Sequence, residues 1–533
     1  MAAGALTQQA AQVLGLAVLL VIFTVLARRL SLAELGAYGL MATLAGYLLV
    51  LKNSVAPAAV RVMVAAPTDA LRAGAFLTAA ALYAVVGIAT GLLIALAGTA
   101  ISFALLDGGL AHEARLGALV LGAVTAVGLA LSVNLDALRA AMRLTRSAAN
   151  EIAALALFAA LMLGLIAVGA DLWLLIGASG SIPLLSGTIN LVARRRLGLA
   201  FRLRRRSVTR GQASAVLPTA GWLLVAELSN LVIYGLDRIV LGAFTGPRTI
   251  GVYEGPLRAH NVLLAMSQAL GVTALPAATR VAGEHESAGE GEGDGEGTAG
   301  GRSPDRLREL AGEGAAGGRS HDRLGELAVR GSRYSLALFV PLTVTAMVLG
   351  APALEVWLGE QFRAGATPLA LLVSYWLLYG ALAVNPAFLV GAGQARRVAL
   401  TAACVAGANL VLSIALTPLL GLEGPALATA IAYLAAFPAF LAITRSVVPG
   451  AVGALARQAW LPAYSLGAAL ALALIGARAA LPLERPGLLI VALLLGPALY
   501  WLAYWRLWLA PGERRLVRDV GRGLLPGRRS RGA

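Results

Sequence analysis

The sequence has little charge and almost no cysteine or lysine. Asp, Glu, Lys and Arg make up 13% of the 533 residues, about half of their share in an average soluble protein. Cys404 is the only cysteine, which excludes an internal disulfide, a CxxC redox pair and a cysteine-based zinc site. Lys52 is the only lysine, and no glycine-rich phosphate loop precedes it. A P-loop nucleotide site is therefore excluded.

Catalytic motifs are also missing. The four histidines are scattered and form no HExxH or paired arrangement, so we expect no metal site and no cofactor. The segment Gly177–Gly180 lacks the spacing of a GxSxG nucleophile elbow. We interpret it, like the GxxxG segment Gly87–Gly91, as small residues at a helix crossing. The sequence therefore predicts a protein that is not an enzyme.

Hydrophobic residues are abundant instead. They make up 59% of the chain, more than soluble domains of ordinary size can hide. Apolar stretches of about 20 residues, long enough to cross a bilayer, recur with short polar gaps. The pattern predicts an all-α polytopic membrane protein with about 14 transmembrane helices. We expect these helices near 10–27, 38–58, 75–99, 116–135, 152–169, 172–193, 215–236, 256–276, 334–354, 366–390, 398–418, 425–444, 458–477 and 487–509.

The net charge of +16 is explained by topology. If both termini are cytoplasmic, most arginines fall in cytoplasmic connections and in the tail, as the positive-inside rule requires. No basic residue precedes Arg28, so we expect the first helix to be retained rather than cleaved as a signal peptide. In this topology Arg28 and Arg29 fall on the opposite, non-cytoplasmic side of the membrane. The basic charge is interpreted as topological, and we expect no nucleic-acid partner.

Two segments of the chain repeat a short pattern. Residues 27–38 and 237–253 both run from a charged helix end through a turn to Gly-x-Tyr, as Gly36-Ala37-Tyr38 and Gly251-Val252-Tyr253. Many transporters consist of two related bundles with a substrate path between them. We expect Asp237 and Arg238, at the start of the second copy, to form a structural pair at a helix end.

An ordered series of motifs over residues 5–447 resembles the polysaccharide (Wzx-like) and oligosaccharide-lipid flippases of the multidrug/oligosaccharidyl-lipid/polysaccharide exporter superfamily. The series comprises Leu26-Ala27-Arg28-Arg29-Leu30, Glu34–Tyr38, Leu236-Asp237-Arg238, Gly251-Val252-Tyr253, Leu275-Pro276, Pro341, Trp357–Phe362, Gly391–Arg396, Asn409 and Thr417–Thr429. The resemblance implies two pseudo-symmetric six-helix lobes around a V-shaped cavity, two additional C-terminal helices, and alternating access.

The resemblance also implies a domain organisation. The lobes would comprise residues 1–193 and 215–447, joined by an Arg-rich cytoplasmic linker at 194–214. Residues 448–509 would form the two extra helices, and 510–533 a basic cytoplasmic tail. A cytoplasmic low-complexity insert at 281–333 contains a tandem duplication, Gly300–Leu307 recurring as Gly317–Leu324.

Charged groups inside the membrane are costly and are the first candidates for function. A lipid-linked sugar carries a phosphate or pyrophosphate, which arginine can bind through bidentate hydrogen bonds. We predict a cavity surface that binds this anion and consists of Arg28, Arg29, Lys52, Asn53, Arg61, Arg258, His260 and Asn261. The alternative for Arg28, Arg29 and Arg61 is an interfacial position with the charged head in water.

Glu227 and Asn230 lie three residues apart and share a helix face. They are candidates for a counter-ion or for a proton or cation coupling site, and a structural pair is the alternative. The energy source stays open between membrane potential, a cation gradient and consumption of the transported lipid.

The expected function is to flip a polyprenyl-(pyro)phosphate-linked oligosaccharide across the cytoplasmic membrane for polysaccharide biosynthesis. Anionic lipids, a polysaccharide polymerase and glycosyltransferases are the expected partners. A lipid II flippase and a cation-coupled multidrug exporter are alternatives within the superfamily. A membrane glycosyltransferase is disfavoured because no large external loop is expected.

Overall fold

The structure is a computed structural model that describes residues 2–65, 68–197, 235–267, 304–382, 389, 394–448, 450–509 and 512–514. Within these ranges every regular element is a helix, and no strand occurs. In the part of the chain that the structure describes, seven helical segments are long and apolar enough to cross a membrane, or eight if one bent pair counts as a single span. The prediction of an all-α, multi-pass membrane protein is confirmed.

The chain divides into two compact units. Unit 1 comprises Met1–Ala265, Trp357–Leu372 and Arg396–Ala436, and unit 2 comprises Met266–Val356, Val373–Ala395 and Phe437–Ala533. The predicted lobes, linker and tail stay predictions. Glu227, Asn230, most of the linker at 194–214 and the first part of the insert at 281–333 lie outside the described residues.

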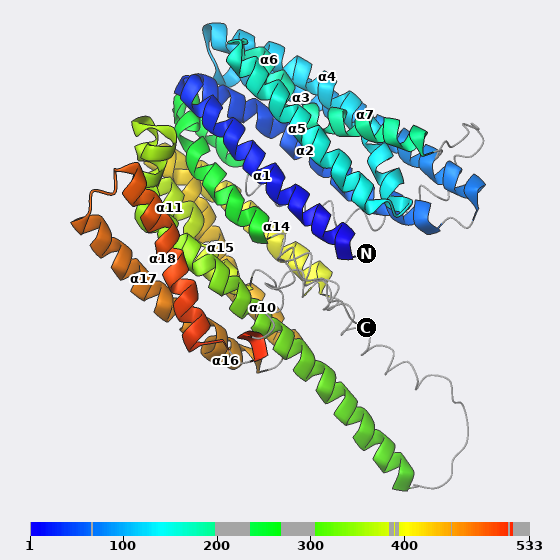
Figure 1. The fold of residues 1–533 in the computed structure, drawn as a ribbon, viewed down its shortest axis with the longest axis vertical. Helices are drawn as coiled ribbons and strands as arrows, with labels where there is room; N and C mark the ends of the chain where they lie inside the picture. The colour runs from blue at the N-terminus through cyan, green and yellow to red at the C-terminus, as the bar shows by residue number, and fades with distance from the viewer. Residues whose placement is uncertain are drawn as a thin grey trace, which may run out of the picture. The chain divides into compact units, whose positions relative to one another are not determined.

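Unit 1 contains most of the first half of the chain (Figure 1). Its helices are α1 (Ala2–Arg29), α2 (Leu32–Ala65), α3 (Asp69–Leu105), α4 (Gly108–Ala140), α5 (Leu144–Ala167), α6 (Leu172–Ser179), α7 (Ser181–Arg196), the helical residues 235–245 and 247–267, the 3-10 helix Glu360–Gly365, and most of α11 (Ala366–Ser374), α14 (Ala395–Leu420) and α15 (Gly424–Val447).

Local sequence explains where two of these helices begin. At the start of α2, the backbone N–H of Ser31 donates to Glu34 Oε2 at 2.8 Å, and the N–H of Glu34 donates to Ser31 Oγ at 3.3 Å. This reciprocal arrangement is a capping box, which satisfies N–H groups that have no partner inside the helix. Thr68 caps α3 in the simpler way, by accepting from the N–H of Leu71 at 3.3 Å.

Glycines allow the helices of unit 1 to pack closely. Cβ atoms added to Gly87 and Gly91 of α3 would meet the carbonyl oxygens of Ala126 and Gly122 on α4. A Cβ on Gly180, between α6 and α7, would lie 2.6 Å from a Leu121 methyl. Both small-residue segments therefore lie at helix crossings, as predicted. At Gly180 the chain bends by 49° between α6 and α7.

A buried polar network joins four helices of unit 1. The Tyr83 hydroxyl of α3 donates to Asp136 on α4, whose side chain is 1% exposed. Arg139, one turn later, lies 3.6 Å from Asp136 and 3.1 Å from Glu151 of α5. Further along, Asn150 of α5 donates to Asn190 of α7 at 2.9 Å. These partners compensate the cost of burying polar groups among apolar helices.

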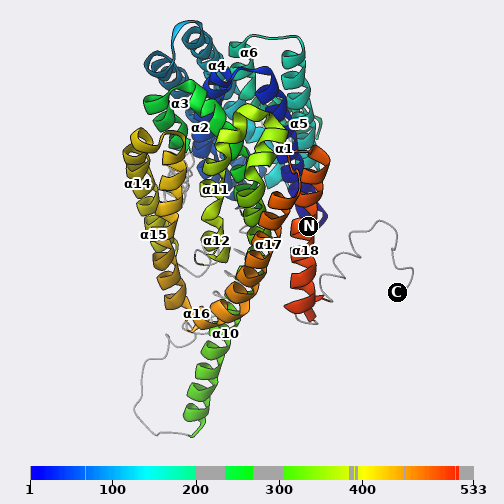
Figure 2. The same cartoon turned by 90° about the vertical axis from the view of Figure 1, so that its left-hand side faces the viewer.

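Unit 2 contains most of the second half of the chain. Its helices are α10 (Pro304–Leu358, to residue 356), α12 (Trp376–Tyr379), the 3-10 helix Gly380–Leu382, the end of α15, α16 (Ala451–Leu455), a π-helical segment (Ala456–Trp460), α17 (Leu461–Ala480) and α18 (Pro486–Leu507). Helices α17 and α18 pack against each other and lie side by side in Figure 1 and Figure 2. Phe339 stacks on Trp376 with ring centroids 4.9 Å apart, and the Tyr464 hydroxyl donates to the Leu377 carbonyl.

Most helices extend beyond the predicted spans. Helix α3 has 37 residues where 75–99 was predicted, and α4 extends from 108 to 140 where 116–135 was predicted. The largest difference is α10, which begins at Pro304 and thus includes the second half of the predicted insert. In the stretch predicted as one helix at 366–390, α11 ends at Ser374 and α12 is separate.

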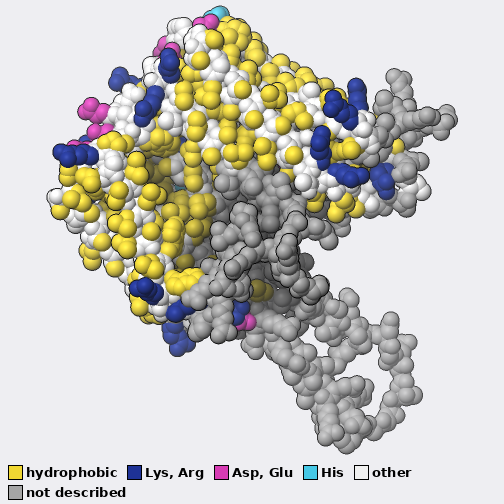
Figure 3. Space-filling model, in the orientation of Figure 1, with side chains coloured by type: hydrophobic (Ala, Val, Ile, Leu, Met, Phe, Trp, Pro, Cys, Tyr) yellow, Lys and Arg dark blue, Asp and Glu magenta, His cyan; other side chains and the backbone are white. Residues whose placement is uncertain are grey.

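The surface of the α3–α7 helices agrees with a membrane environment. Figure 3 shows hydrophobic side chains over the face of these helices and basic side chains gathered toward its ends. Large apolar residues such as Val85, Leu96 and Phe103 of α3 are exposed. A soluble protein rarely exposes contiguous apolar patches of this kind.

Candidate functional site

The C-terminal end of α1 is joined to the C-terminal end of α10, and both lie in unit 1. The Arg28 guanidinium donates to the Trp357 carbonyl from Nε at 3.2 Å and from Nη2 at 2.9 Å. In return, Trp357 Nε1 donates to Thr24 Oγ1 at 2.8 Å, and the Trp357 ring meets Phe23 edge-on. Because the last carbonyls of a helix have no partner inside it, Arg28 acts here as a cap. Arg29 is exposed.

The next predicted residues lie on α2. Lys52, Asn53 and Arg61 are all within this helix, and their side chains lie outside the described part of the structure. Their assignment to an anion-binding surface stays a prediction.

Helical residues 235–245 and 247–267 carry a buried group of charges. Arg238 donates from Nε and Nη2 to the two carboxylate oxygens of Glu254, the second at 3.2 Å. The same carboxylate lies 3.4 Å from Nη2 of Arg258, one turn further along its helix. The Glu254 side chain is 1% exposed, Arg238 8% and Arg258 25%. One carboxylate thus serves two guanidinium groups, and Arg258 is the more accessible of the two.

The neighbours of this group are aromatic or polar. The Arg258 guanidinium lies over the Phe23 ring, 5.1 Å from its centroid, an arrangement that favours a cation. The Tyr253 hydroxyl donates to Asp237 at 2.8 Å. We predicted a structural pair between Asp237 and Arg238, but the main contact of each is with another residue. Asp237 accepts from the Tyr253 hydroxyl, and Arg238 binds Glu254. His260 is fully buried, and Asn261 is half-buried.

The two Gly-x-Tyr segments lie against each other. A Cβ on Gly36 would overlap the Pro247 carbonyl oxygen and lie 3.0 Å from the Gly251 amide nitrogen. A Cβ on Gly251 would overlap the Leu32 carbonyl oxygen. Gly39, one turn after Gly36, leaves room for the Glu254 carboxylate. The internal repeat of the sequence thus marks a crossing where backbone meets backbone beside the buried charges.

The structure brings together only part of the predicted set. Arg28, Arg258, His260 and Asn261 all belong to unit 1, and Phe23 of α1 links the Arg28–Trp357 contact to Arg258. Sequence reasoning missed Glu254 and Trp357. The i, i+4 spacing between Glu254 and Arg258 could have identified Glu254 from the sequence. Among the residues described, no group of three or more His, Cys, Asp or Glu side chains could hold a metal ion.

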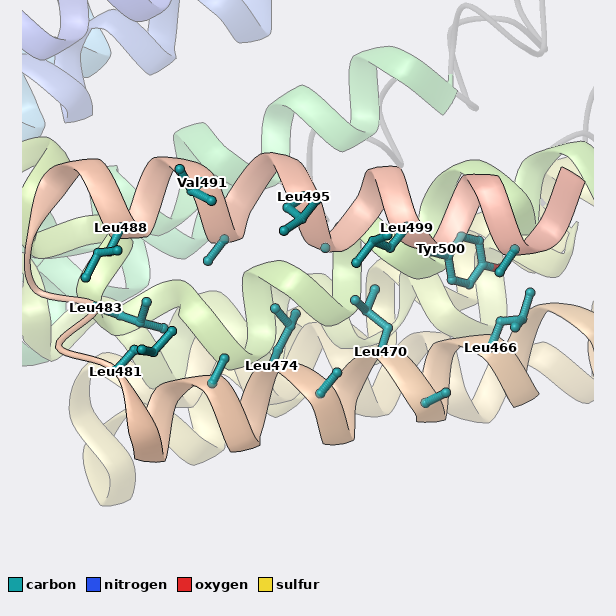
Figure 4. A pocket seen from close by; sticks show the side chains of 16 residues that line it. Leu466, Leu470, Leu474, Leu481, Leu483, Leu488, Val491, Leu495, Leu499 and Tyr500 are labelled. Atoms are coloured by element: carbon teal, nitrogen blue, oxygen red, sulfur yellow. The ribbon is translucent and has the colours of Figure 1, made fainter.

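Unit 2 contains an apolar groove between α17 and α18. Its volume is about 390 Å³, within the range of small-ligand sites. Figure 4 shows leucines of the two helices, including Leu470, Leu474 and Leu495, pointing toward one another across it. Tyr500 also lines the groove, and its hydroxyl donates to the Ala463 carbonyl at 3.2 Å. The lining therefore offers almost only hydrocarbon to a ligand.

Comparisons with known proteins give matches at the level of structure. No family model matches the sequence, and no curated protein matches it. A solved structure of the lipid II flippase MurJ in an inward closed conformation superposes with a TM-score of 0.63 at 12% identity, covering 98% of this chain and 100% of that one.

Two further structures are transporters. An inward-facing multidrug resistance MATE family transporter of the MOP superfamily has a TM-score of 0.57 at 14% identity, with 82% of this chain and 94% of that one covered. A mutant form of the Vibrio cholerae MATE transporter VcmN has a TM-score of 0.52 at 13% identity, with 83% and 96% covered. The chain thus has the fold of MOP-superfamily transporters, and these neighbours are transporters and flippases rather than enzymes.

Proposed function

We propose that the protein flips a polyprenyl-(pyro)phosphate-linked oligosaccharide across the cytoplasmic membrane by alternating access. The observation that carries this proposal is Arg258 of unit 1, an arginine whose side chain is a quarter exposed and lies over the Phe23 ring. Such a substrate has an anionic headgroup, which arginine binds well, and a long hydrocarbon tail. The likeness in fold to a lipid II flippase supports the same class of substrate.

The headgroup interacts with basic residues of unit 1. Arg258 is the main ligand because a quarter of its side chain is exposed, and Lys52 and Arg61 contribute further positive charge. Arg28 and Arg29 stay at the end of α1, where Arg28 also caps α10. Asn261, half-buried on the same helix as Arg258, is proposed as a further polar contact, and the buried His260 precedes it in the chain. Glu227 and Asn230 are proposed as the coupling site or counter-ion.

Within unit 2, the groove between α17 and α18 is proposed as a site for a prenyl chain. The groove lining is leucine, alanine, valine and glycine with one tyrosine, which suits an isoprenoid chain and offers nothing to a drug cation. Each methylene buried there contributes about 0.8 kcal/mol. A cationic drug would instead require acidic side chains, and the acid closest to Arg258, Glu254, is already paired.

The protein acts, in this proposal, with both termini cytoplasmic, beside anionic lipids and together with a polysaccharide polymerase and glycosyltransferases. Lipid II has the same prenyl pyrophosphate and is the alternative substrate. The fold shared with MATE transporters makes a multidrug substrate the second alternative.

A matched pair of variants tests the role of the groove. Leu474→Trp fills it, whereas Leu472→Trp places the same ring on a neighbouring position of α17 whose side chain is 72% exposed. In proteoliposomes, Leu474→Trp is expected to raise the apparent KM for a long-chain prenyl pyrophosphate oligosaccharide about tenfold, the effect of displacing two methylenes. Leu472→Trp is expected to behave like the wild type.

Tail length supplies the second arm of this experiment. An analogue with a ten-carbon prenyl chain is expected to be flipped with the same KM by wild type and by Leu474→Trp, because it does not reach along the groove. If Leu474→Trp and Leu472→Trp flip the long-chain substrate equally well, the groove does not hold the tail.

A further inference from the structure

We propose that Glu254 is the exchange partner of the substrate's pyrophosphate: it holds Arg258 while the site is empty and releases Arg258 when the anion binds. This inference rests on the proposed function, because it takes a lipid-linked pyrophosphate as the ligand. It assigns a role to an acid that neither the sequence motifs nor the resemblance identifies.

The contacts of Glu254 are unequal. With Arg238 its carboxylate forms a bidentate pair, and both side chains are almost fully buried. With Arg258 it has a single contact of 3.4 Å, made by the oxygen that also accepts from Arg238 at 3.2 Å. Bidentate Arg–carboxylate pairs are the stronger kind. An incoming anion therefore competes for Arg258, while Arg238 keeps Glu254.

Arg258 has a spare donor for such an anion. Its Nε is buried and has no hydrogen-bond partner among the described residues. A buried donor without an acceptor is costly. If the guanidinium turns away from Glu254, Nε and Nη2 become a planar fork that matches two oxygens of a phosphate group. The empty state thus leaves a donor of Arg258 unsatisfied, and ligand binding relieves that cost.

Other charges near Arg258 are already engaged. Asp237 accepts from the Tyr253 hydroxyl, and Arg238 is bound to Glu254. His260 is buried on the same helix. Glu254 is therefore the acid that sets how strongly Arg258 is held.

The exchange also affects the packing of Glu254 against helix α2. The Glu254 carboxylate fills the space beside Gly39 of α2, next to the crossing of Gly36 and Gly251. When Arg258 leaves, the carboxylate depends on Arg238 alone, and its contact with α2 changes. A ligand shifts a conformational equilibrium only through contacts that differ between the states, and this contact supplies such a difference.

The test measures binding and flipping by the full chain. Glu254→Gln keeps the shape of the side chain and removes its charge. The double variant Arg238→Gln/Glu254→Gln avoids leaving Arg238 buried without a counter-ion. Glu151→Gln, which breaks a 3.1 Å ion pair with Arg139 elsewhere in unit 1, is the matched control. The probes are undecaprenyl pyrophosphate and inorganic pyrophosphate, with the binding constant measured by titration in detergent.

Both Glu254 variants are expected to bind undecaprenyl pyrophosphate about tenfold more tightly than wild type, because a charge-assisted competitor is removed. The gain for inorganic pyrophosphate is expected to be the same factor, since the change acts on the headgroup alone. In proteoliposomes the apparent KM and the maximal flipping rate both fall, because a headgroup held more tightly is released more slowly. Damage to the fold would lower the rate without tightening binding.

Two outcomes distinguish a failure of the exchange from a failure of the proposed function. If wild type binds undecaprenyl pyrophosphate and both Glu254 variants bind it equally or more weakly, the exchange is refuted while the proposed function stands. If wild type binds neither probe, the proposed function fails, and the exchange fails with it. Glu151→Gln is expected to match wild type in affinity and in rate.

Discussion

The crossing of α2 with helical residues 247–267 should not tolerate a methyl group at Gly36. In Gly36→Ala the new Cβ would overlap the Pro247 carbonyl oxygen and lie 3.0 Å from the Gly251 amide nitrogen. Both obstacles are backbone atoms, which cannot rotate away as a side chain could. The two helices must therefore separate, and overpacking of this kind costs about 1–3 kcal/mol.

Gly46→Ala is the control on the same helix, because nothing lies within 4 Å of a Cβ built there. In a helix, alanine is favoured over glycine by about 1 kcal/mol, and this gain applies to both variants. The difference between them thus isolates the crossing. Denaturant titration of the purified full chain in mixed micelles, followed by tryptophan fluorescence, should show a lower midpoint for Gly36→Ala than for Gly46→Ala. The difference should correspond to a free energy of unfolding that is about 1–3 kcal/mol smaller. Equal midpoints would refute the close approach.

Two further substitutions test hydrogen bonds within unit 1 by the same denaturant titration. Arg28→Ala removes both hydrogen bonds to the Trp357 carbonyl and is expected to cost about 0.5–1.5 kcal/mol because these hydrogen bonds are exposed to solvent. Arg29→Ala, at a neighbouring position that is also exposed, should stay within about 0.5 kcal/mol of wild type. Similar values for the two would contradict a capping role. Tyr83→Phe removes the hydroxyl that donates to the buried Asp136 and is expected to cost about 1.5–3 kcal/mol, so an unchanged midpoint would show that this hydrogen bond contributes little.

The transmembrane character of the chain was predictable because it depends on composition over windows of about 20 residues. The helix ends were not, because hydropathy reports only the part of a helix that lies in hydrocarbon. Helix α2 illustrates this: its first turn contains the polar capping box of Ser31 and Glu34, which lies before the apolar stretch predicted at 38–58. Likewise α10 begins at Pro304, within a polar segment.

The basic residues of the candidate site could be selected from the sequence, but the residues that they contact could not. An arginine within an apolar helix is visible in the sequence, so Arg258 could be selected. The partner of Arg28 could not, because Trp357 lies 329 residues away and only the fold brings them together. Glu254 lies between these cases: its spacing from Arg258 follows the helical period, but its bidentate pairing with Arg238 requires two helices to meet.

The repeated Gly-x-Tyr pattern also shows that the sequence does not specify which distant segments are in contact. It indicated that two parts of the chain are related, as in many transporters. That Gly36 and Gly251 lie against each other follows from packing alone, because no feature of either segment specifies its neighbour. The motif predicted a relationship between the halves, and the structure adds a contact.

Headgroup translocation by the purified full chain in proteoliposomes tests the proposed flippase activity most directly. The substrates to compare are a polyprenyl-pyrophosphate-linked oligosaccharide, lipid II and a cationic dye, each against protein-free vesicles. We expect the oligosaccharide lipid to cross faster than in protein-free vesicles, and we expect Arg258→Ala to abolish most of this gain. Transport of the dye alone, or oligosaccharide translocation that is unchanged in Arg258→Ala, would contradict the proposed function.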